Sequence, residues 1–95
     1  MKMIFLSYKQ SVNDEIMEIF ENLNITSYTK WPEVQDKCDT GRPRMGSHIW
    51  PGLNSAFMIP LDDEKSSILM TRIKDLNETI KHEKVKAFVM PIEET

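Results

Sequence analysis

The sequence has little cysteine and no long hydrophobic run. Its one cysteine, Cys38, cannot form an internal disulfide, so folding requires no oxidising compartment. The apolar run Met3–Leu6 stops at the polar Ser7, which leaves it shorter than the core of a signal peptide. No run approaches the ~20 apolar residues of a membrane-spanning helix. We therefore expect a cytoplasmic protein with no direct membrane insertion.

Positive charge is also scarce. The chain has 12 lysines and arginines against 15 acidic residues, which gives a formal net charge of −3. Proteins that bind nucleic acid obtain most of their affinity from basic side chains that neutralise phosphates. We expect no nucleic-acid partner.

The length of 95 residues leaves room for one domain, which we place at 1–95. A domain of this size buries only ~60–65% of the surface that its unfolded chain exposes. A partner that covers more apolar surface would therefore add noticeably to its stability.

Hydrophobic periodicity predicts two helices and four strands. The predicted helices span 12–23, with Ser11 as N-cap, and 63–82. The predicted strands span 1–9, 25–31, 55–61 and 85–92, and a long loop covers about 32–54. This βαββαβ order favours an α+β, ferredoxin-like fold, in which a four-stranded antiparallel sheet carries both helices on one face. The first and third strands should be central because they are strongly apolar.

Both faces of the predicted sheet are apolar. If the helices cover Ile4 and Leu6, the other face still carries Met3 and Phe5, and the reverse assignment has the same consequence. An apolar face of this extent usually marks an interface. The alternative is a monomer with a mildly apolar open face.

The unusual residues gather in the 32–54 loop. All three glycines lie between positions 41 and 52. Arg42, Arg44, His48 and Trp50 lie there too, with Cys38 just upstream. Loops of ~20 residues in small domains are usually functional or disordered, so we place function here.

At this loop the sequence resembles the P-II signalling family, through the order of its elements and the segment Ile25–Val34, which leads into the loop. The resemblance implies a homotrimer that binds a small effector between subunits and contacts a partner protein, such as a membrane transporter. The CutA family, which shares the trimeric fold, is the neighbouring possibility. By resemblance, the contact and effector candidates are Thr40, Gly41, Arg42, Arg44, Gly46, Ser47 and His48.

The sequence departs from the P-II pattern after the second helix. The junction Lys81–Val85 contains no Gly-rich, basic turn of the kind that holds phosphate in that family. The identity of the effector and of any cofactor therefore stays open. The turn around Arg42 and Arg44 could bind an anion or could be a solvated turn.

Two further hypotheses concern the same loop. Trp50 could stack on a ligand or anchor a partner, or it could simply fix the end of the loop to the domain. Cys38, Met45 and His48 combine ligands suited to Cu(I) or, without Met45, to zinc, which makes a CutA-like metal-binding protein the alternative function. Met45 could equally be an apolar contact.

No set of residues suggests a nucleophile, a base and an oxyanion site. We therefore expect a binding protein and not an enzyme.

Overall fold

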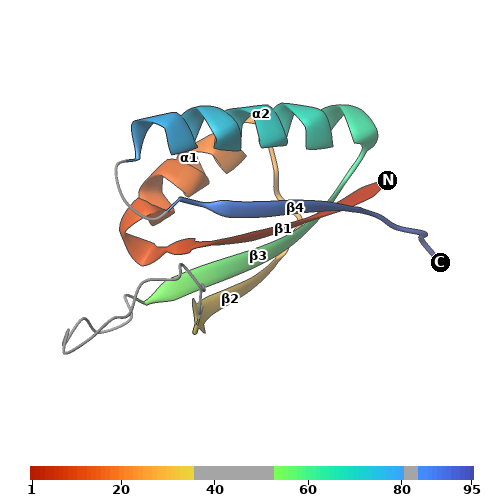
Figure 1. Cartoon of the computed structure of the whole chain (residues 1–95). Helices are drawn as coiled ribbons and strands as arrows, with labels where there is room; N and C mark the ends of the chain where they lie inside the picture. Colours follow the sequence, from red (N-terminus) through yellow and green to blue (C-terminus); the bar gives the residue numbers. More distant parts are fainter. Residues whose placement is uncertain (36–52, 81–83) are drawn as a thin grey trace, which may run out of the picture.

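The computed structural model describes residues 1–35, 53–80 and 84–95. Figure 1 shows a twisted antiparallel sheet with both helices packed on one face, which confirms the predicted α+β, ferredoxin-like fold. The elements in chain order are β1 (Lys2–Lys9), the 3-10 helix η1 (Gln10–Val12), α1 (Asn13–Asn22), β2 (Thr29–Val34), β3 (Asn54–Leu61), α2 (Asp63–Thr79) and β4 (Lys86–Pro91).

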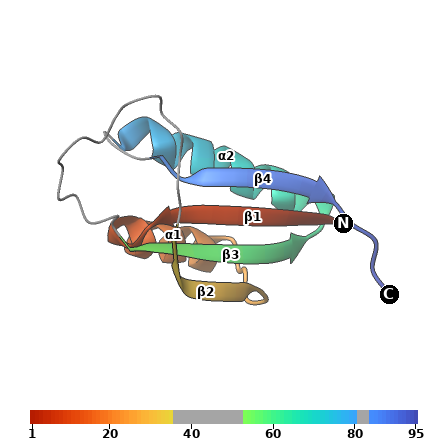
Figure 2. The same ribbon diagram turned by 60° about the horizontal axis from the view of Figure 1, so that its bottom comes forward.

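The strand order β2-β3-β1-β4 places β1 and β3 in the centre of the sheet, as predicted (Figure 2). Leu6 lies opposite Phe57 on one side and Ala87 on the other. Because side chains alternate along a strand, this register puts the even positions of β1 and the odd positions of β3 on the same face. That face is the one that the helices cover.

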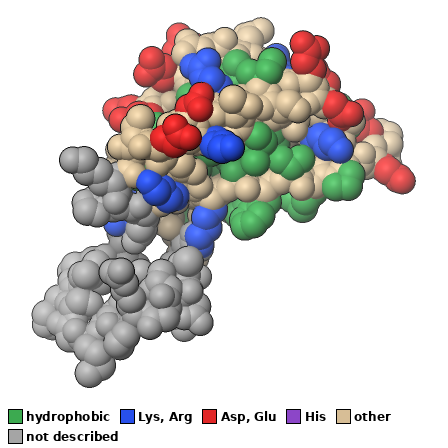
Figure 3. Space-filling model, turned by 45° about the horizontal axis from the view of Figure 1, so that its top comes forward, with side chains coloured by type: hydrophobic (Ala, Val, Ile, Leu, Met, Phe, Trp, Pro, Cys, Tyr) green, Lys and Arg blue, Asp and Glu red, His purple; other side chains and the backbone are tan. Residues whose placement is uncertain are grey.

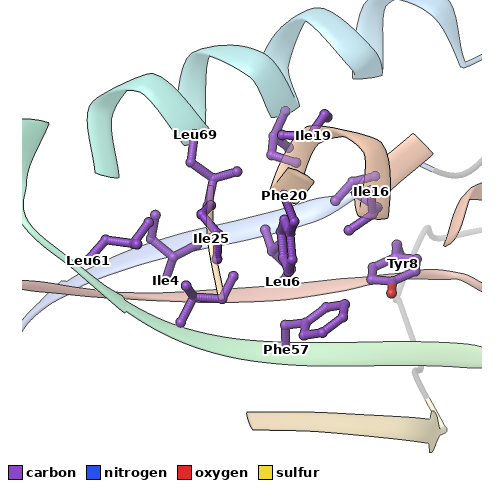
Figure 4. Close-up of a cluster of buried hydrophobic side chains, with 13 residues drawn as sticks. Ile4, Leu6, Tyr8, Ile16, Ile19, Phe20, Ile25, Phe57, Leu61 and Leu69 are labelled. Carbon is purple, nitrogen blue, oxygen red and sulfur yellow. The ribbon is translucent and has the colours of Figure 1, made fainter. Parts of the chain in front are cut away.

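The core lies between this face and the two helices (Figure 4). Phe57 is fully buried, and its ring centroid is 4.8 Å from that of Phe20 and 6.0 Å from that of Tyr8. Each such side chain contributes about 1.5–3 kcal/mol on burial. The core also contains Ile4 and Leu6 from β1, Ile16 and Ile19 from α1, Ile59 and Leu61 from β3, and Leu69 and Ile73 from α2.

The N-terminus of α1 differs from the prediction. Ser11 lies inside η1 and is not the N-cap, a position that Val12 occupies without a side-chain cap. The chain leaves β1 through a 3-10 turn, so α1 begins one residue later than predicted. At α2 the N-cap is Asp62, whose carboxylate accepts a 2.7 Å hydrogen bond from the Lys65 backbone N–H.

The predicted strand 25–31 is wrong at both ends. After α1 the chain turns through Asn24, at φ 57°, and Ile25 enters the core, where its backbone N–H donates to the Phe20 carbonyl. Because the N–H of Ile25 is bonded to the end of α1 and its side chain is in the core, Ile25 does not pair with β3. The strand therefore begins at Thr29.

The predicted loop 32–54 is correspondingly too long, because Pro32–Val34 belong to β2 and Asn54 begins β3. Pro32 is tolerated inside β2 because β2 is an edge strand, where a missing backbone donor costs little.

The second helix ends at Thr79 and not at residue 82, since Ile80 is already extended. The Lys84 ammonium donates to the carbonyls of Asn77 and Ile80 and so satisfies the helix end. The apolar pattern of the predicted helix includes Ile68, Leu69 and Ile73, of which Leu69 and Ile73 are buried, whereas Ile68 is 41% exposed and does not belong to the core.

This exposure difference predicts unequal effects for neighbouring substitutions on α2. Leu69→Ala should lower the free energy of unfolding by about 2–5 kcal/mol, because it leaves a cavity in the core. Ile68→Ala, one position away, should cost less than about 1 kcal/mol. Urea denaturation of both variants measures the difference, and equal losses would contradict the helix orientation.

Candidate functional site

The face of the sheet without helices has an apolar half near the chain termini. Phe5 and Phe88 lie opposite each other on adjacent strands, with ring centroids 6.5 Å apart. Phe88 is 57% exposed and Met90, paired with Met3, is 38% exposed. A solvent-exposed cluster of large apolar side chains is unusual for a monomer and typical of an interface. We call Met3, Phe5, Met58, Phe88 and Met90 the apolar patch.

The other half of this face holds a pocket of about 250 Å3, next to the point where β2 ends and β3 begins. We call it the loop-end pocket. It combines two aromatic walls with a buried serine hydroxyl and a side-chain amide. Its lining residues are Phe5, Ser7, Trp31, Val34, Gln35 and Ala56.

Two lysines flank the loop-end pocket on the same face. Lys86 lies opposite Ser7 across the β1–β4 ladder, and Lys9 lies opposite Asn54 across the β1–β3 ladder. Because Ser7 and Lys9 are two residues apart, they share a face of the sheet. Hydroxyl, amide and ammonium donors beside aromatic walls suit a small anion or a ligand with one anionic end.

Polar contacts on the opposite side of the sheet hold β2 in place. The Tyr8 hydroxyl donates a 2.7 Å hydrogen bond to Asn13 Oδ1, which also accepts a 3.4 Å contact from Lys30 Nζ. Lys30 Nζ lies 5.2 Å from the centroid of the Phe57 ring. Burial, the largest effect, raises the pKa of Tyr8 to about 12. A hydrogen bond with Ser55 lowers this pKa, and nearby Tyr28 raises it.

The side of the molecule that carries the helices offers a less defined site. Figure 3 shows acidic and basic side chains interspersed there, with hydrophobic side chains between them. Grooves of about 360 and 420 Å3 lie beside α2 and at the end of α1, respectively. Their linings mix core-flanking apolar residues with a single charge each, Lys74 beside α2 and Glu21 at the end of α1.

The junction between α2 and β4 is fixed by side-chain hydrogen bonds. The Asn77 side chain donates to the Val85 carbonyl at 3.0 Å and accepts from the Val85 N–H at 2.8 Å. Lys84 is the one described residue among 81–84, and its ammonium group donates hydrogen bonds to the carbonyls of Asn77 and Ile80 at the end of α2. In this chain Lys84 therefore acts as a helix cap.

All the site residues predicted from the sequence fall within 36–52, outside the described residues. These are the ligand candidates Thr40, Gly41, Arg42, Arg44, Gly46, Ser47, His48 and Trp50, and the metal candidates Cys38, Met45 and His48. Within the described ranges, no group of three His, Cys, Asp or Glu side chains could hold a metal ion. The metal hypothesis remains a prediction.

The sequence interpretation missed the loop-end pocket itself. One signal was available in β1, because Ser7 and Lys9 interrupt the apolar pattern of Met3 and Phe5 at alternate positions. This change from apolar to polar side chains along one face falls where the loop-end pocket begins.

None of the described helices is long and apolar enough to cross a membrane.

No protein-family model matches this sequence, and no curated protein matches it significantly. Solved structures do match. A PII-like signalling protein from Thermus thermophilus superposes with a TM-score of 0.66 at 19% identity, over 94% of this chain and 83% of that one. CPII, a nitrogen regulatory PII-like protein from Thiomonas intermedia, gives 0.71 at 14% identity, over 96% and 88% of the two chains.

This chain has the fold of the PII-like signalling proteins. The resemblance to the P-II family that the sequence suggested is thus confirmed at the level of the fold. The CPII structure just described contains ADP, AMP and bicarbonate. A second CPII structure, with a TM-score of 0.68 at 13% identity over 93% of this chain and 81% of that one, contains ADP, AMP and acetate.

The raised pKa of Tyr8 predicts a loss of stability at alkaline pH. The unfolded chain releases this proton near pH 10 and the folded chain near pH 12, so stability falls as pH rises between them. By pH 11 this titration should lower the free energy of unfolding by about 1.4 kcal/mol.

Urea denaturation at pH 9 and pH 11 tests this expectation. The stability gap between wild type and Tyr8→Phe should narrow by about 1.4 kcal/mol from pH 9 to pH 11. Tyr28→Phe, at an exposed position, is the control, and its free energy of unfolding should fall between pH 9 and pH 11 nearly as much as that of the wild type. A gap that stays constant would show that Tyr8 is not buried as described.

Proposed function

We propose that this chain is the subunit of a homotrimeric PII-like regulatory protein that binds a small anionic effector at the loop-end pocket. The observation on which this proposal rests is the division of one sheet face into an apolar patch and a lysine-flanked pocket. The first requires a cover, and the second offers donors to an anion. In this proposal the protein binds its effector without converting it.

The apolar patch supports the trimer. Two central strands and one edge strand contribute to it, so a flat surface several side chains wide is exposed in one chain. A stable interface buries about 800 Å2 per partner, and apolar burial contributes about 25 cal/mol per Å2 before the costs of association. The PII-like fold supplies the stoichiometry of three through the resemblance to the P-II family.

The loop-end pocket supports the anionic effector. At about 250 Å3 it is smaller than the 300–1,000 Å3 of most ligand sites, as expected for a pocket that a neighbouring subunit completes. The ligands named for CPII, which are ADP, AMP, bicarbonate and acetate, are all anions. Lys9 and Lys86 would neutralise such a charge, and Trp31 would pack against its apolar part.

The 36–52 segment begins beside this pocket, so we assign contact with a partner protein to it. Arg42 and Arg44 would be the principal contacts there. A membrane transporter remains the kind of partner that the P-II resemblance suggests.

The oligomeric state tests the first part of the proposal. Light scattering at micromolar concentration should give three times the chain mass of 11.1 kDa. Phe88→Glu should shift the mass toward that of one chain, because it places a charge in the apolar patch. Ile68→Glu, at an exposed apolar position on α2, should leave the trimer intact. A wild-type monomer would refute the trimer, and a Phe88→Glu variant that stays trimeric would refute the apolar patch as its interface.

Ligand titration tests the second part. ADP, AMP and bicarbonate should be titrated separately by calorimetry, and at least one should bind. Lys9→Gln and Lys86→Gln should each weaken that binding about tenfold or more, because a hydrogen bond to a charged group contributes about 1.5–3 kcal/mol. Lys65→Gln on α2 is the matched control. Failure of all three anions, or lysine variants that bind like wild type, would refute the site.

A further inference from the structure

The turn that follows β1 contacts the chain before and after the 36–52 segment. The Gln10 backbone N–H donates a 2.9 Å hydrogen bond to the carbonyl of Leu53, which directly follows that segment. The Gln10 side-chain Nε2 donates a 2.7 Å hydrogen bond to the carbonyl of Pro32, which precedes it. One residue of η1 therefore joins two chain positions that are 21 residues apart in sequence, Pro32 and Leu53.

The end of β2 has little else to hold it. β2 is an edge strand with β3 as its strand neighbour, and five of its six residues are exposed. Its pairing with β3 is regular from Thr29 to Trp31 and then shifts register before Val34. A strand that buries so little apolar surface gains little from the hydrophobic effect, so its polar contacts matter more.

Those polar contacts converge on the carbonyl of Pro32. It accepts the bond from Gln10 Nε2 and a second 2.7 Å bond from Ser55 Oγ of β3. The proline lacks an N–H, so its carbonyl is the one main-chain group through which this position can be fastened. Gln10 approaches it from the β1–α1 connection and Ser55 from the neighbouring strand.

The fastened segment forms one wall of the loop-end pocket. Trp31, Val34 and Gln35 line the pocket from β2 and the residue after it, on either side of Pro32. Ala56 lines it from β3, three residues after Leu53. Figure 2 shows the end of β1, the start of β3 and the end of β2 at the same end of the sheet. Gln10 of η1 is bonded to both Pro32 and Leu53, so the distance between these two walls of the pocket depends on it.

We infer that Gln10 is a positioning residue for the loop-end pocket. It bonds the carbonyls of Pro32 and Leu53 to η1 and so sets the geometry of the pocket before a ligand binds. Its relevance to effector binding rests on the proposed function, whereas the fastening itself does not. Because η1 leads directly into α1, the same contact also joins the pocket wall to the start of that helix.

Glutamine suits this position for two reasons. Its amide supplies an N–H donor, which the carbonyl of Pro32 requires. Glutamate has the same shape but offers only acceptors when ionised, so Gln10→Glu removes the bond and places a carboxylate against a carbonyl. Both Gln10→Ala and Gln10→Glu retain the backbone N–H that donates to Leu53. The two variants therefore isolate the side-chain contact.

Amide hydrogen exchange of the protein without ligand tests the positioning role. In Gln10→Ala and Gln10→Glu, the amides of 31–35 and 54–56 should exchange about fivefold faster, the factor expected for the loss of one hydrogen bond. The amides of α2 should keep their wild-type rates. Ser11→Ala, an exposed neighbour in the same turn, is the matched control and should change neither region.

Two results would overturn the inference. One is wild-type exchange at 31–35 in both Gln10 variants. The other is equal acceleration in α2, which would show a global loss of stability. Neither outcome depends on a ligand, so the proposed function can fail separately through the absence of anion binding. If ADP binds the wild type, Gln10→Ala should weaken it about fivefold with unchanged stoichiometry, and unchanged affinity would also oppose the inference.

Discussion

The structure depends on one constraint, which is that a four-stranded sheet has two faces and this chain has helices for only one of them. The core between the sheet and the helices is complete, with Phe57, Leu6 and Leu69 fully buried. The opposite face repeats the same apolar character at Phe5 and Phe88 without a cover from the described chain. A second layer of protein is the simplest way to remove that surface from water.

The helix-free face divides into an apolar half and a polar half. Met3 and Phe5 occupy the first half of β1 on this face, and Ser7 and Lys9 occupy the second half. The change in polarity falls where the pocket begins. Hydrogen bonds replace hydrophobic burial as the main contacts at this end, through the carbonyl of Pro32 and the amide of Gln10. Such contacts are weak one by one, so they allow local adjustment that a packed core would resist.

The comparison of sequence and structure shows where periodicity is a sufficient guide. The order of the elements and the central position of β1 and β3 could be predicted, because buried residues recur about every 2.0 residues along a strand and about every 3.6 residues along a helix. The start of β2 could not be predicted. A β-branched, apolar residue such as Ile25 suits a strand, but it can equally pack in the core after a turn, as it does here after Asn24. The exposure of Ile68 could not be predicted from its hydrophobicity either, because an apolar residue next to the buried stripe of a helix can face the core or the solvent.

The sequence by itself determined the fold class and the apolar character of both faces of the sheet. These follow from local chemistry, which each residue carries wherever it is placed. The tertiary structure decided which residues share the loop-end pocket and that Gln10 joins Pro32 to Leu53. Those facts depend on contacts between β1, β2 and β3, and contacts between distant segments exist only once the chain has folded.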